Sequence, residues 1–499
     1  MKSTSTYFNA LREHISGYKR EIQTPYGSFP LTYFDWTATG RGFLPIDYQM
    51  IHEISPNTGN THSESNYIGE YSTKAYHHAI SIIKEHVGAN ESDIVLGVGN
   101  GTTAAIIKLQ NFLGFRLHEK FKSKVDLASV EKPVVFVTHM EHHSNHISWI
   151  ETIADVVIVE PNQYGEVDPQ QLVKALEKYQ DRKIKIGSFA ACSNVTGIET
   201  PYHELAKIMH QHDGFCFVDF AASAPYVPIN MHPENPDERL DAIFFSPHKF
   251  LGGHRTCGIL IFNECLYNNA VPDYPGGGTV LYTTPWEARK YYDDIQIRED
   301  GGTPPFLQII QVSMCLLLKE EMLKNGMQEQ KDYLLHHLWT QLNEIKGVTI
   351  LEGEKSKRQG IVSFYVEGIH HSLLSKLLSQ RYGIQVRPGC SCAGTYGHYL
   401  LNIGPEESRR ITSELDKGIL SSKPGWVRIS LHPTNTLCEI NSFIVALHEI
   451  ISNINIWEKD YVYCETSNEY RNILENELSV SSLFTSWKDK MVQSSVKIN

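Results

Sequence analysis

The chain has 499 residues, of which 41% are hydrophobic and 20% are charged, and its formal net charge is −12. A chain of this length and composition can bury a large core, and we expect a soluble globular protein of two or more domains. The negative balance, with no run of lysines and arginines, argues against a general nucleic-acid-binding protein, because neutralising phosphates requires a concentrated basic surface.

Targeting signals and cysteine usage point to the cytoplasm. Residues 1–20 contain no apolar core of a secretory signal, and no stretch reaches the apolar length that a bilayer requires, so no membrane association is expected. Nine cysteines lie mostly scattered through apolar segments, which fits reduced thiols better than a disulfide framework. The pair Cys390-Ser-Cys392 stands apart, and it lacks the four ligands of a structural zinc site. Either reactivity or coincidence explains that pair.

Short apolar runs alternate with amphipathic helical stretches along the chain, beginning with a strand-like run at residues 31–36 and a helical spacing over 71–87. This alternation is typical of βαβ units and predicts a mostly parallel sheet. Helical periodicity dominates from about residue 307, followed by strand-like residues 360–366 and a helix over 372–382. A second, smaller domain is therefore expected after the first.

The segment 93–109 reads as a strand, a turn rich in glycine and threonine, and a helix. Backbone N–H groups and the hydroxyls of Thr102 and Thr103 would meet at the start of that helix, where the helix dipole favours an anion. The turn lacks the residues of a P-loop and of a dinucleotide fingerprint. It predicts a site for a single phosphate group, and an ordinary helix cap is the alternative.

Four histidines follow the apolar run 133–138, at the point where open α/β sheets place their ligands. A metal site is one interpretation, but no set of Asp, Glu or Cys completes it at a recognisable spacing. We favour an imidazole stacked on a planar cofactor, with a solvated loop as the alternative. No metal is expected.

Polar residues also follow the next three apolar runs, where Asn194, Asp219 and Lys249 stand. A carboxylate at a strand end is unfavourable unless it meets a partner. Lys249 lies in a short turn between two apolar runs, and desolvation with neighbouring cations would lower its pKa and suit imine chemistry. A structural lysine is the alternative, yet the three groups are expected to converge at one sheet edge.

As an ordered set, these motifs resemble the pyridoxal phosphate enzymes of the class V aminotransferase group, which includes cysteine desulfurases, selenocysteine lyases and isopenicillin-N-epimerase-like proteins. The resemblance spans roughly residues 30–450. It implies the type I fold of pyridoxal phosphate-dependent transferases, an α/β large domain with a mostly parallel seven-stranded sheet between helices, plus a smaller α+β C-terminal domain. The expected divisions are an N-terminal segment 1–30, a large domain 31–306, a small domain 307–455 and an extension 456–499.

The resemblance also implies roles for single residues. Lys249 would hold pyridoxal 5′-phosphate as a Schiff base, Asp219 would pair with the pyridine nitrogen, and His142 would stack on the ring. Asn194 would contact the phenolic oxygen of the cofactor. The phosphate group would be held by four residues of two turns, Thr102, Thr103, Ser246 and His248.

Two glycine-rich segments, residues 274–279 and 298–304, resemble those that complete the phosphate site from a second subunit. They contain Thr279 and Thr303, the residues expected to bind the cofactor there. The resemblance therefore implies a homodimer with shared active sites.

Two motifs of the C-terminal half concern the substrate. The pattern Arg-x-Gly-x-x-Cys-Ala over residues 387–393 is similar to the desulfurase segment that presents the sulfur-accepting cysteine, and it selects Cys392. Arg428 matches the arginine that grips the substrate carboxylate, a task that suits a planar guanidinium. Two features depart from the family: Ala222 stands where desulfurases carry a glutamine, and the segment 393–426 is longer.

The leading hypothesis is a cysteine desulfurase-like lyase that removes sulfur or selenium from cysteine or selenocysteine to give alanine, through a persulfide on Cys392. An acceptor protein would then take the sulfur. A class V aminotransferase or epimerase without a catalytic cysteine is the alternative, and a binding protein without catalysis is the third hypothesis. The residues do not indicate the natural substrate.

Overall fold

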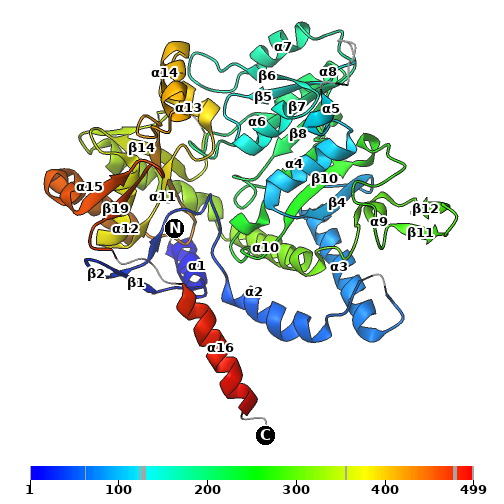
Figure 1. The fold of residues 1–499 in the computed structure, drawn as a ribbon, viewed down its shortest axis with the longest axis horizontal. Helices are drawn as coiled ribbons and strands as arrows, with labels where there is room; N and C mark the ends of the chain where they lie inside the picture. Colours follow the sequence, from blue (N-terminus) through cyan, green and yellow to red (C-terminus); the bar gives the residue numbers. More distant parts are fainter. Residues whose placement is uncertain are drawn as a thin grey trace.

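The computed structural model describes residues 2–61, 63–122, 124, 131–353, 357–475 and 480–496. A large lobe and a small lobe lie side by side, with the N-terminal segment running beneath them (Figure 1). Besides the helices that cover the two sheets, the chain has α1 (Lys2–Glu13), α2 (Leu44–Gln49), α5 (Glu119–Lys122), α9 (Ile295–Glu299), α13 (Gly394–Leu400), α14 (Pro405–Asp416) and α16 (Ser481–Val496).

The large lobe is built on a sheet that, within the described ranges, has seven strands. Their spatial order is β4 (Asp93–Val98), β10 (Gly258–Asn263), β9 (Ala242–Phe245), β8 (Phe215–Asp219), β7 (Lys185–Ala190), β5 (Val134–Thr138) and β6 (Asp155–Val159). Strand β10 pairs antiparallel with both of its neighbours, and the other pairs are parallel. The predicted mostly parallel sheet is confirmed.

Helices cover both faces of this sheet because its strands carry apolar residues on both faces. In β5, Val134 and Phe136 pack on one face, while Val135 and Val137 pack on the other, as a period of two requires. The first face is covered by α3 (Tyr67–His86), α7 (Pro169–Glu177), α8 (Tyr202–Gln211) and α10 (Phe306–Lys324), and the second by α4 (Gly101–Phe112) and α6 (His143–Ile150). This arrangement places every parallel strand end at one edge.

The small lobe has a separate core. Its antiparallel sheet has, in the described chain, the order β13 (Val348–Ile350), β14 (Ile361–Val366), β17 (Trp426–Ser430) and β16 (Arg387–Gly389). Helices α11 (Met327–Asn343), α12 (His371–Tyr382) and α15 (Leu437–Trp457) pack with it. The predicted α+β character of this region is confirmed.

Helix α15 has an apolar composition. Among the described residues, the segment Leu437–Asp460 is the one helical stretch long and apolar enough to cross a membrane, with a hydropathy of 1.3. One face of α15, including Ile440, Phe443 and Leu447, is buried in the small-lobe core. That burial is the behaviour of a core helix, although the sequence alone predicted no stretch of this length.

The N-terminal segment joins the two lobes. After the hairpin β1 (Glu21–Thr24) and β2 (Gly27–Pro30), strand β3 (Thr32–Tyr33) pairs in parallel with β15 (Ile384–Gln385) of the small lobe. Seven residues later, the N–H of Gly40 donates to the carbonyl oxygen of His248 in the large lobe at 2.8 Å. Residues 32–40 therefore form a strap across the gap between the lobes.

Hairpins and the C-terminal extension complete the chain: β11 (Val280–Thr283) with β12 (Arg289–Tyr291), and β18 (Tyr461–Cys464) with β19 (Glu469–Asn472). The first hairpin projects from the large lobe (Figure 1). The expected domain boundaries remain a prediction. The buried residues of α10, which lies almost wholly in the range expected for the small domain, belong to the core of the large lobe. 

Candidate active site

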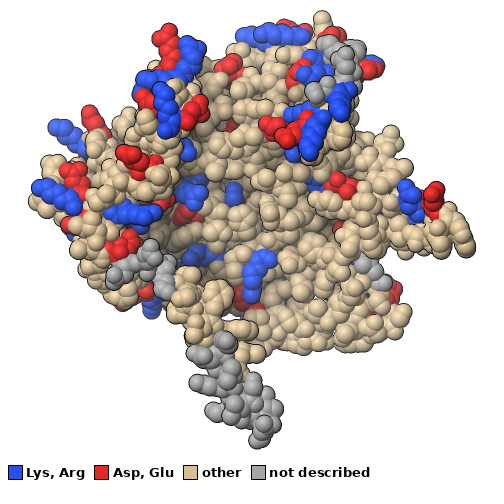
Figure 2. Space-filling view, viewed as in Figure 1, with Lys and Arg blue, Asp and Glu red and all other residues tan. Residues whose placement is uncertain are grey.

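The strand ends of the large sheet meet in a cavity of about 300 Å³. Eight of the predicted large-lobe site residues and both small-lobe candidates line it: Thr102, Thr103, His142, Asn194, Asp219, Ser246, His248, Lys249, Cys392 and Arg428, together with Ala222. Figure 2 shows basic side chains in the middle of this face, between the two lobes. The expected convergence of Asn194, Asp219 and Lys249 is thus present in the geometry.

One end of the cavity is rich in hydroxyls and lies at the start of α4. Thr102 donates its N–H to Oγ of Ser246 at 2.8 Å, and the two hydroxyls are also 2.8 Å apart. Oγ1 of Thr103 lies 2.6 Å from Oγ of Ser144. The side chain of Asn100, at the N-cap of α4, makes no capping hydrogen bond in the described structure. Hydroxyls and a helix N-terminus together provide the donors that suit an anion.

Gly101 is required at this turn. Its backbone has φ +63°, and a Cβ atom there would lie 2.7 Å from Oγ of Ser246. A side chain would therefore displace the hydroxyl that contacts Thr102. The glycine of the predicted phosphate turn keeps the strand end and the serine in contact.

Asp219 and Lys249 face each other across the cavity floor. Burial raises the pKa of Asp219 to about 6, although the N–H of Ala221, which donates at 2.8 Å, and Lys249 both act to lower it. Burial lowers the pKa of Lys249, with Arg428 acting in the same direction and Asp219 opposing it. A lysine with a lowered pKa is more readily the neutral amine that reacts with an aldehyde.

The histidines of the site are neutral rings. Burial, with Lys249 nearby, lowers the pKa of His142 to about 3 and that of His248 to about 4. Nδ1 of His142 accepts from the N–H of Ser144 at 3.1 Å and caps α6. His248 is held by Thr39 of the strap, whose Oγ1 donates to its carbonyl oxygen at 3.2 Å.

The small lobe supplies the other wall. Arg428 is 3% exposed and donates to the carbonyl oxygen of Asn194 at 3.0 Å and to Asp35 at 2.9 Å. The amide of Asn194 donates to the carbonyl oxygen of Ser391 at 2.7 Å, and its Oδ1 is buried with no partner among the described residues. An unpaired acceptor here, beside Lys249, is a position where a ligand donor or a reoriented amide fits.

Two predicted residues lie elsewhere. In the described part of the chain, Thr279 and Thr303 do not line this cavity: Oγ1 of Thr279 donates to Gly276 at 2.7 Å, and that of Thr303 to Asn60 at 3.3 Å. Cys390 packs against the large-lobe core, whereas Cys392 is exposed at the cavity wall. A contribution from Thr279 and Thr303 would have to be to a partner's site, as the resemblance implies.

Sequence reasoning missed several residues that line the cavity, namely Thr37, Ala38, Asn100, Ser144, Cys192 and Ser391. It also missed Asp35, which pairs with Arg428. Ser144 could have been found from its place two residues after His142 at the start of a helix. The pairing of Asp35 with a residue 393 positions away leaves no local signal.

Other candidate sites carry less chemistry. No group of three His, Cys, Asp or Glu side chains in the described structure could hold a metal ion. A larger cavity of about 830 Å³ lies near the start of α15, lined by residues such as Asn9, Lys324 and Tyr333. It has no lysine paired with a carboxylate at a sheet edge, so we place the chemistry in the smaller cavity.

The fold and this cavity define a pyridoxal phosphate-dependent enzyme of type I fold. The chain belongs to the aminotransferase class-V family, whose sequence model matches residues 32–443. The resemblance drawn from the sequence motifs is therefore confirmed, and this family consists of pyridoxal phosphate-dependent enzymes.

Curated relatives and solved structures agree with the family. A probable cysteine desulfurase of Halalkalibacterium halodurans is 26% identical over 73% of this chain and 84% of its own length. A cysteine desulfurase of Haloferax volcanii is 24% identical over 73% of this chain and 81% of its own. The apo cysteine desulfurase of Thermococcus onnurineus superimposes with a TM-score of 0.70 at 21% identity, covering 89% of this chain and 98% of that one. The protein is thus desulfurase-like in sequence and fold.

Proposed function

We propose that this chain is a cysteine desulfurase-like enzyme that converts cysteine to alanine and takes the sulfur atom onto Cys392. The observation that carries the proposal is that Cys392 and Lys249, 143 positions apart in sequence, line the same cavity. The names of the relatives support the reaction type. Selenocysteine, which differs from cysteine in one atom, is a second substrate to be tested.

The residues present fit pyridoxal phosphate. The hydroxyl-rich start of α4 suits its phosphate group, Asp219 suits a protonated pyridine nitrogen, and the amine of Lys249 suits its aldehyde. Neutral His142 suits stacking on the ring. When bound, the cofactor supplies an electron sink that stabilises negative charge at the α-carbon of an amino acid.

Each remaining role belongs to a side chain of the cavity. Arg428 would bind the substrate carboxylate, because its guanidinium is buried and fixed. Lys249 would carry a proton between the α-carbon and solvent, since its lowered pKa lets the amine act as a base. Cys392 would attack the substrate sulfur as a thiolate, so that an S–S bond forms while the bond between that sulfur and the β-carbon breaks. The electron pair of the broken bond stays with the carbon skeleton, and protonation there gives alanine and leaves a persulfide on Cys392.

The test uses the protein with pyridoxal phosphate and cysteine, without reductant. Alanine is quantified, and the peptide with both loop cysteines is examined by mass spectrometry for one added sulfur atom. We expect Cys392→Ala to lower alanine formation about 100-fold or more, in line with loss of a nucleophile. The matched control, Cys390→Ala, should retain most of the activity. Unchanged alanine formation by Cys392→Ala would contradict the persulfide role.

The anchoring of the cofactor is tested separately. Borohydride reduction should fix pyridoxal phosphate covalently to the Lys249 peptide, and Lys249→Ala should retain no covalent cofactor. A protein that takes up no added pyridoxal phosphate would support a binding protein without catalysis. Formation of a keto acid, with no alanine from cysteine, would support the aminotransferase alternative, which the substitution by Ala222 favours.

We also infer a homodimer with shared sites and a protein that accepts the sulfur. The support for the dimer is the hairpin β11–β12, whose Leu281, Tyr282 and Trp286 are half or more exposed, next to the glycine-rich segment with Thr279. Sedimentation at micromolar concentration tests the dimer. A variant Thr279→Val that binds pyridoxal phosphate as tightly as wild type would remove this residue from the cofactor site.

A further inference from the structure

The turn that carries Cys392 has an unfavourable backbone. Ser391 and Cys392 have φ values of +52° and +57°, and the N–H of Ala393 donates to the carbonyl oxygen of Cys390 at 3.1 Å. Residues with a Cβ atom seldom adopt this left-handed conformation, least of all two in succession. Such a turn persists only where surrounding groups hold it.

His143, at the first position of α6, makes two hydrogen bonds with the backbone that follows the Cys392 side chain. Its N–H donates to the carbonyl oxygen of Cys392 at 2.8 Å. Two residues further along the turn, the N–H of Gly394 donates to Nε2 of His143 at 2.9 Å. Asn194 adds a third hydrogen bond from the large lobe, to the carbonyl oxygen of Ser391. The turn is thus bound at Ser391, Cys392 and Gly394, before and after the thiol.

The imidazole of His143 is suited to accept a hydrogen bond at Nε2. Burial, with the charge of Lys423, lowers its pKa, so the ring is neutral at neutral pH and Nε2 has a free lone pair. A Cβ atom on Gly394 would lie 3.2 Å from Nε2, and the contact is therefore tight as well as polar. Both observations indicate a fitted contact between the two lobes.

The start of α6 also presents His142 to the cavity. The His142 ring caps this helix by accepting from Ser144 at 3.1 Å, which fixes the backbone from which His143 extends. Adjacent residues therefore define the position of the cofactor-facing ring and that of the cysteine turn. Because both residues lie in the first turn of α6, the His142 ring and the cysteine turn can move little relative to each other.

We propose that His143 is a positioning residue that sets Cys392 at the distance and orientation needed to accept sulfur. The proposal rests on the desulfurase function proposed above. His143 does not touch the reacting atoms, and its effect is expected on the sulfur-transfer step rather than on amino-acid binding. A misplacement of about 1 Å can lower a rate about 100-fold, which sets the scale of the effect.

The test compares His143→Leu with His143→Gln, because the glutamine Oε1 can replace Nε2 as an acceptor and leucine cannot. We expect His143→Leu to lower kcat for alanine formation about 10- to 100-fold with less than a threefold change in KM. His143→Gln should remain within about threefold of wild type. His146→Leu is the matched control: it lies on the same helix and contacts Thr395, beyond the cysteine turn, at 3.2 Å.

Hydrogen exchange provides a readout independent of catalysis. Amides of residues 390–394 should exchange faster in His143→Leu than in wild type, and at the wild-type rate in His143→Gln and His146→Leu. Equal exchange in His143→Leu and wild type, or an unchanged kcat, would overturn the proposal. So would a rise in KM matching the loss in kcat, or loss of bound cofactor, since either indicates general damage.

The two proposals fail differently. A wild-type protein that forms no alanine from cysteine would overturn the proposed function and the catalytic role of His143 with it. In that case, faster exchange confined to His143→Leu would still support the placement of the turn by His143. If alanine forms normally and exchange is the same in all variants, the positioning role alone is overturned.

Discussion

Nη2 of Arg428 donates to Oδ1 of Asp35 at 2.9 Å, across 393 positions of sequence. Asp35 lies on the strap of residues 32–40, and its backbone forms a parallel bridge with Ser430, two residues after the arginine. The guanidinium is therefore fixed by the N-terminal segment before any substrate arrives. Its Nε is buried without a partner among the described residues, so a donor remains for a ligand or a small shift.

This pairing predicts how amino acids bind. Arg428→Lys should raise KM for cysteine about 10- to 100-fold, because a hydrogen bond to a charged group contributes about 1.5–3 kcal/mol and lysine lacks the planar fork. Asp35→Asn should raise KM less, since the guanidinium keeps its bond to Asn194. Steady-state kinetics with cysteine measures both. A larger effect of Asp35→Asn than of Arg428→Lys would contradict this order.

Ala222 predicts an altered cofactor environment. It is 6% exposed and packs with Cys192 and Ile361 in a small apolar cluster at the cavity wall. Ala222→Gln would add a donor near the phenolic oxygen that the family resemblance places there, and a donor favours the ionised oxygen. The pH at which the absorbance of bound cofactor changes should fall by about one unit in Ala222→Gln, the direction of hydrogen bonding to the charged form.

Ala222→Leu is the control for bulk, because it fills the same space without a donor. Either substitution is expected to destabilise the protein by about 1–3 kcal/mol through overpacking. The absorbance midpoint should move only in the glutamine variant. Identical pH titrations of Ala222→Gln and wild type would show that this position does not reach the cofactor oxygen.

The large lobe was predictable because its strands are buried on both faces. In runs such as residues 133–138, every residue but the last is apolar, and each run is followed by a turn with polar residues. Since parallel strands end at one edge, the order of Thr102, His142, Asn194 and Asp219 was enough to place them together. The local sequence pattern and the sheet topology therefore point to the same group of residues.

The part of the cavity wall that the small lobe supplies could not be predicted from the order of strand ends. Cys392 and Arg428 were identified by resemblance, but their contacts with His143 and Asp35 join segments far apart in sequence. The left-handed φ of Ser391 and Cys392 has no signature either, because neither residue is glycine. Contacts between the lobes depend on the relative orientation of two separate cores. The hydrophobic periodicity of a sequence contains no information about that orientation.

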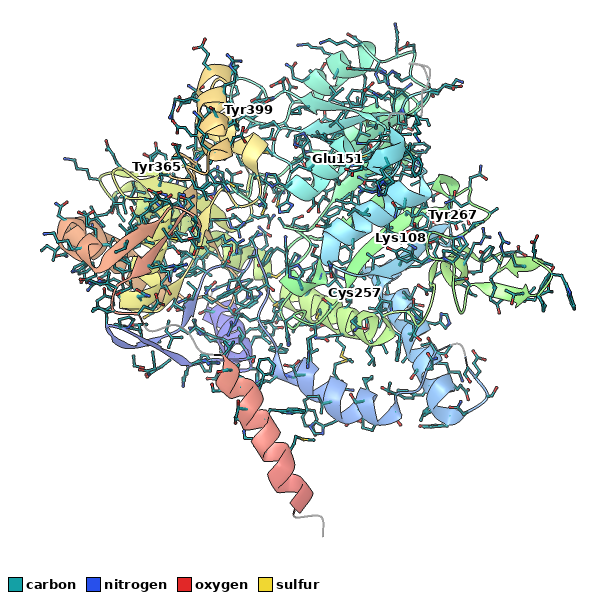
Figure 3. All side chains as sticks on the ribbon, viewed as in Figure 1. Lys108, Glu151, Cys257, Tyr267, Tyr365 and Tyr399 are labelled. Atoms are coloured by element: carbon teal, nitrogen blue, oxygen red, sulfur yellow. The ribbon has the colours of Figure 1, made fainter. Side chains whose placement is uncertain are left out.

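A buried ion pair between α4 and α9 predicts a large loss of stability when it is broken. Lys108 of α4 and Glu299 of α9 are 2.5 Å apart, with side chains 2% and 0% exposed, and Tyr267 donates to the same carboxylate at 2.6 Å. Figure 3 labels Lys108 and Tyr267 in the large lobe. Lys108→Met leaves Glu299 buried without its cation, which should destabilise the protein by about 3–5 kcal/mol. The double variant Lys108→Met/Glu299→Gln should recover much of this loss.

Urea denaturation of the cofactor-free protein measures these variants. The single and double variants differ in whether the Glu299 charge is left unpaired, because Asp273, whose carboxylate lies 3.7 Å from Nζ of Lys108, loses this cation in both. Their comparison therefore isolates the cost of the unpaired Glu299 charge. A loss below about 1 kcal/mol in Lys108→Met would mean that water or another group satisfies Glu299, against the burial seen here.

His432 predicts how stability depends on pH. It is 2% exposed, stacks on Trp36 with ring centroids 4.1 Å apart, and burial lowers its pKa from 6.5 to about 3. Between those two pH values the unfolded chain binds a proton here and the folded chain does not, so this contribution to stability is complete above pH 6.5 and declines as the pH falls toward 3.

The substitution His432→Phe keeps an aromatic ring to stack on Trp36 and removes the group that binds the proton. The free energy of unfolding should therefore fall less steeply with acid in the variant, by up to about 1.4 kcal/mol per pH unit. Urea midpoints between pH 4 and 6 compare the two slopes, and equal slopes would place the acid sensitivity in other buried groups such as His86 and His142.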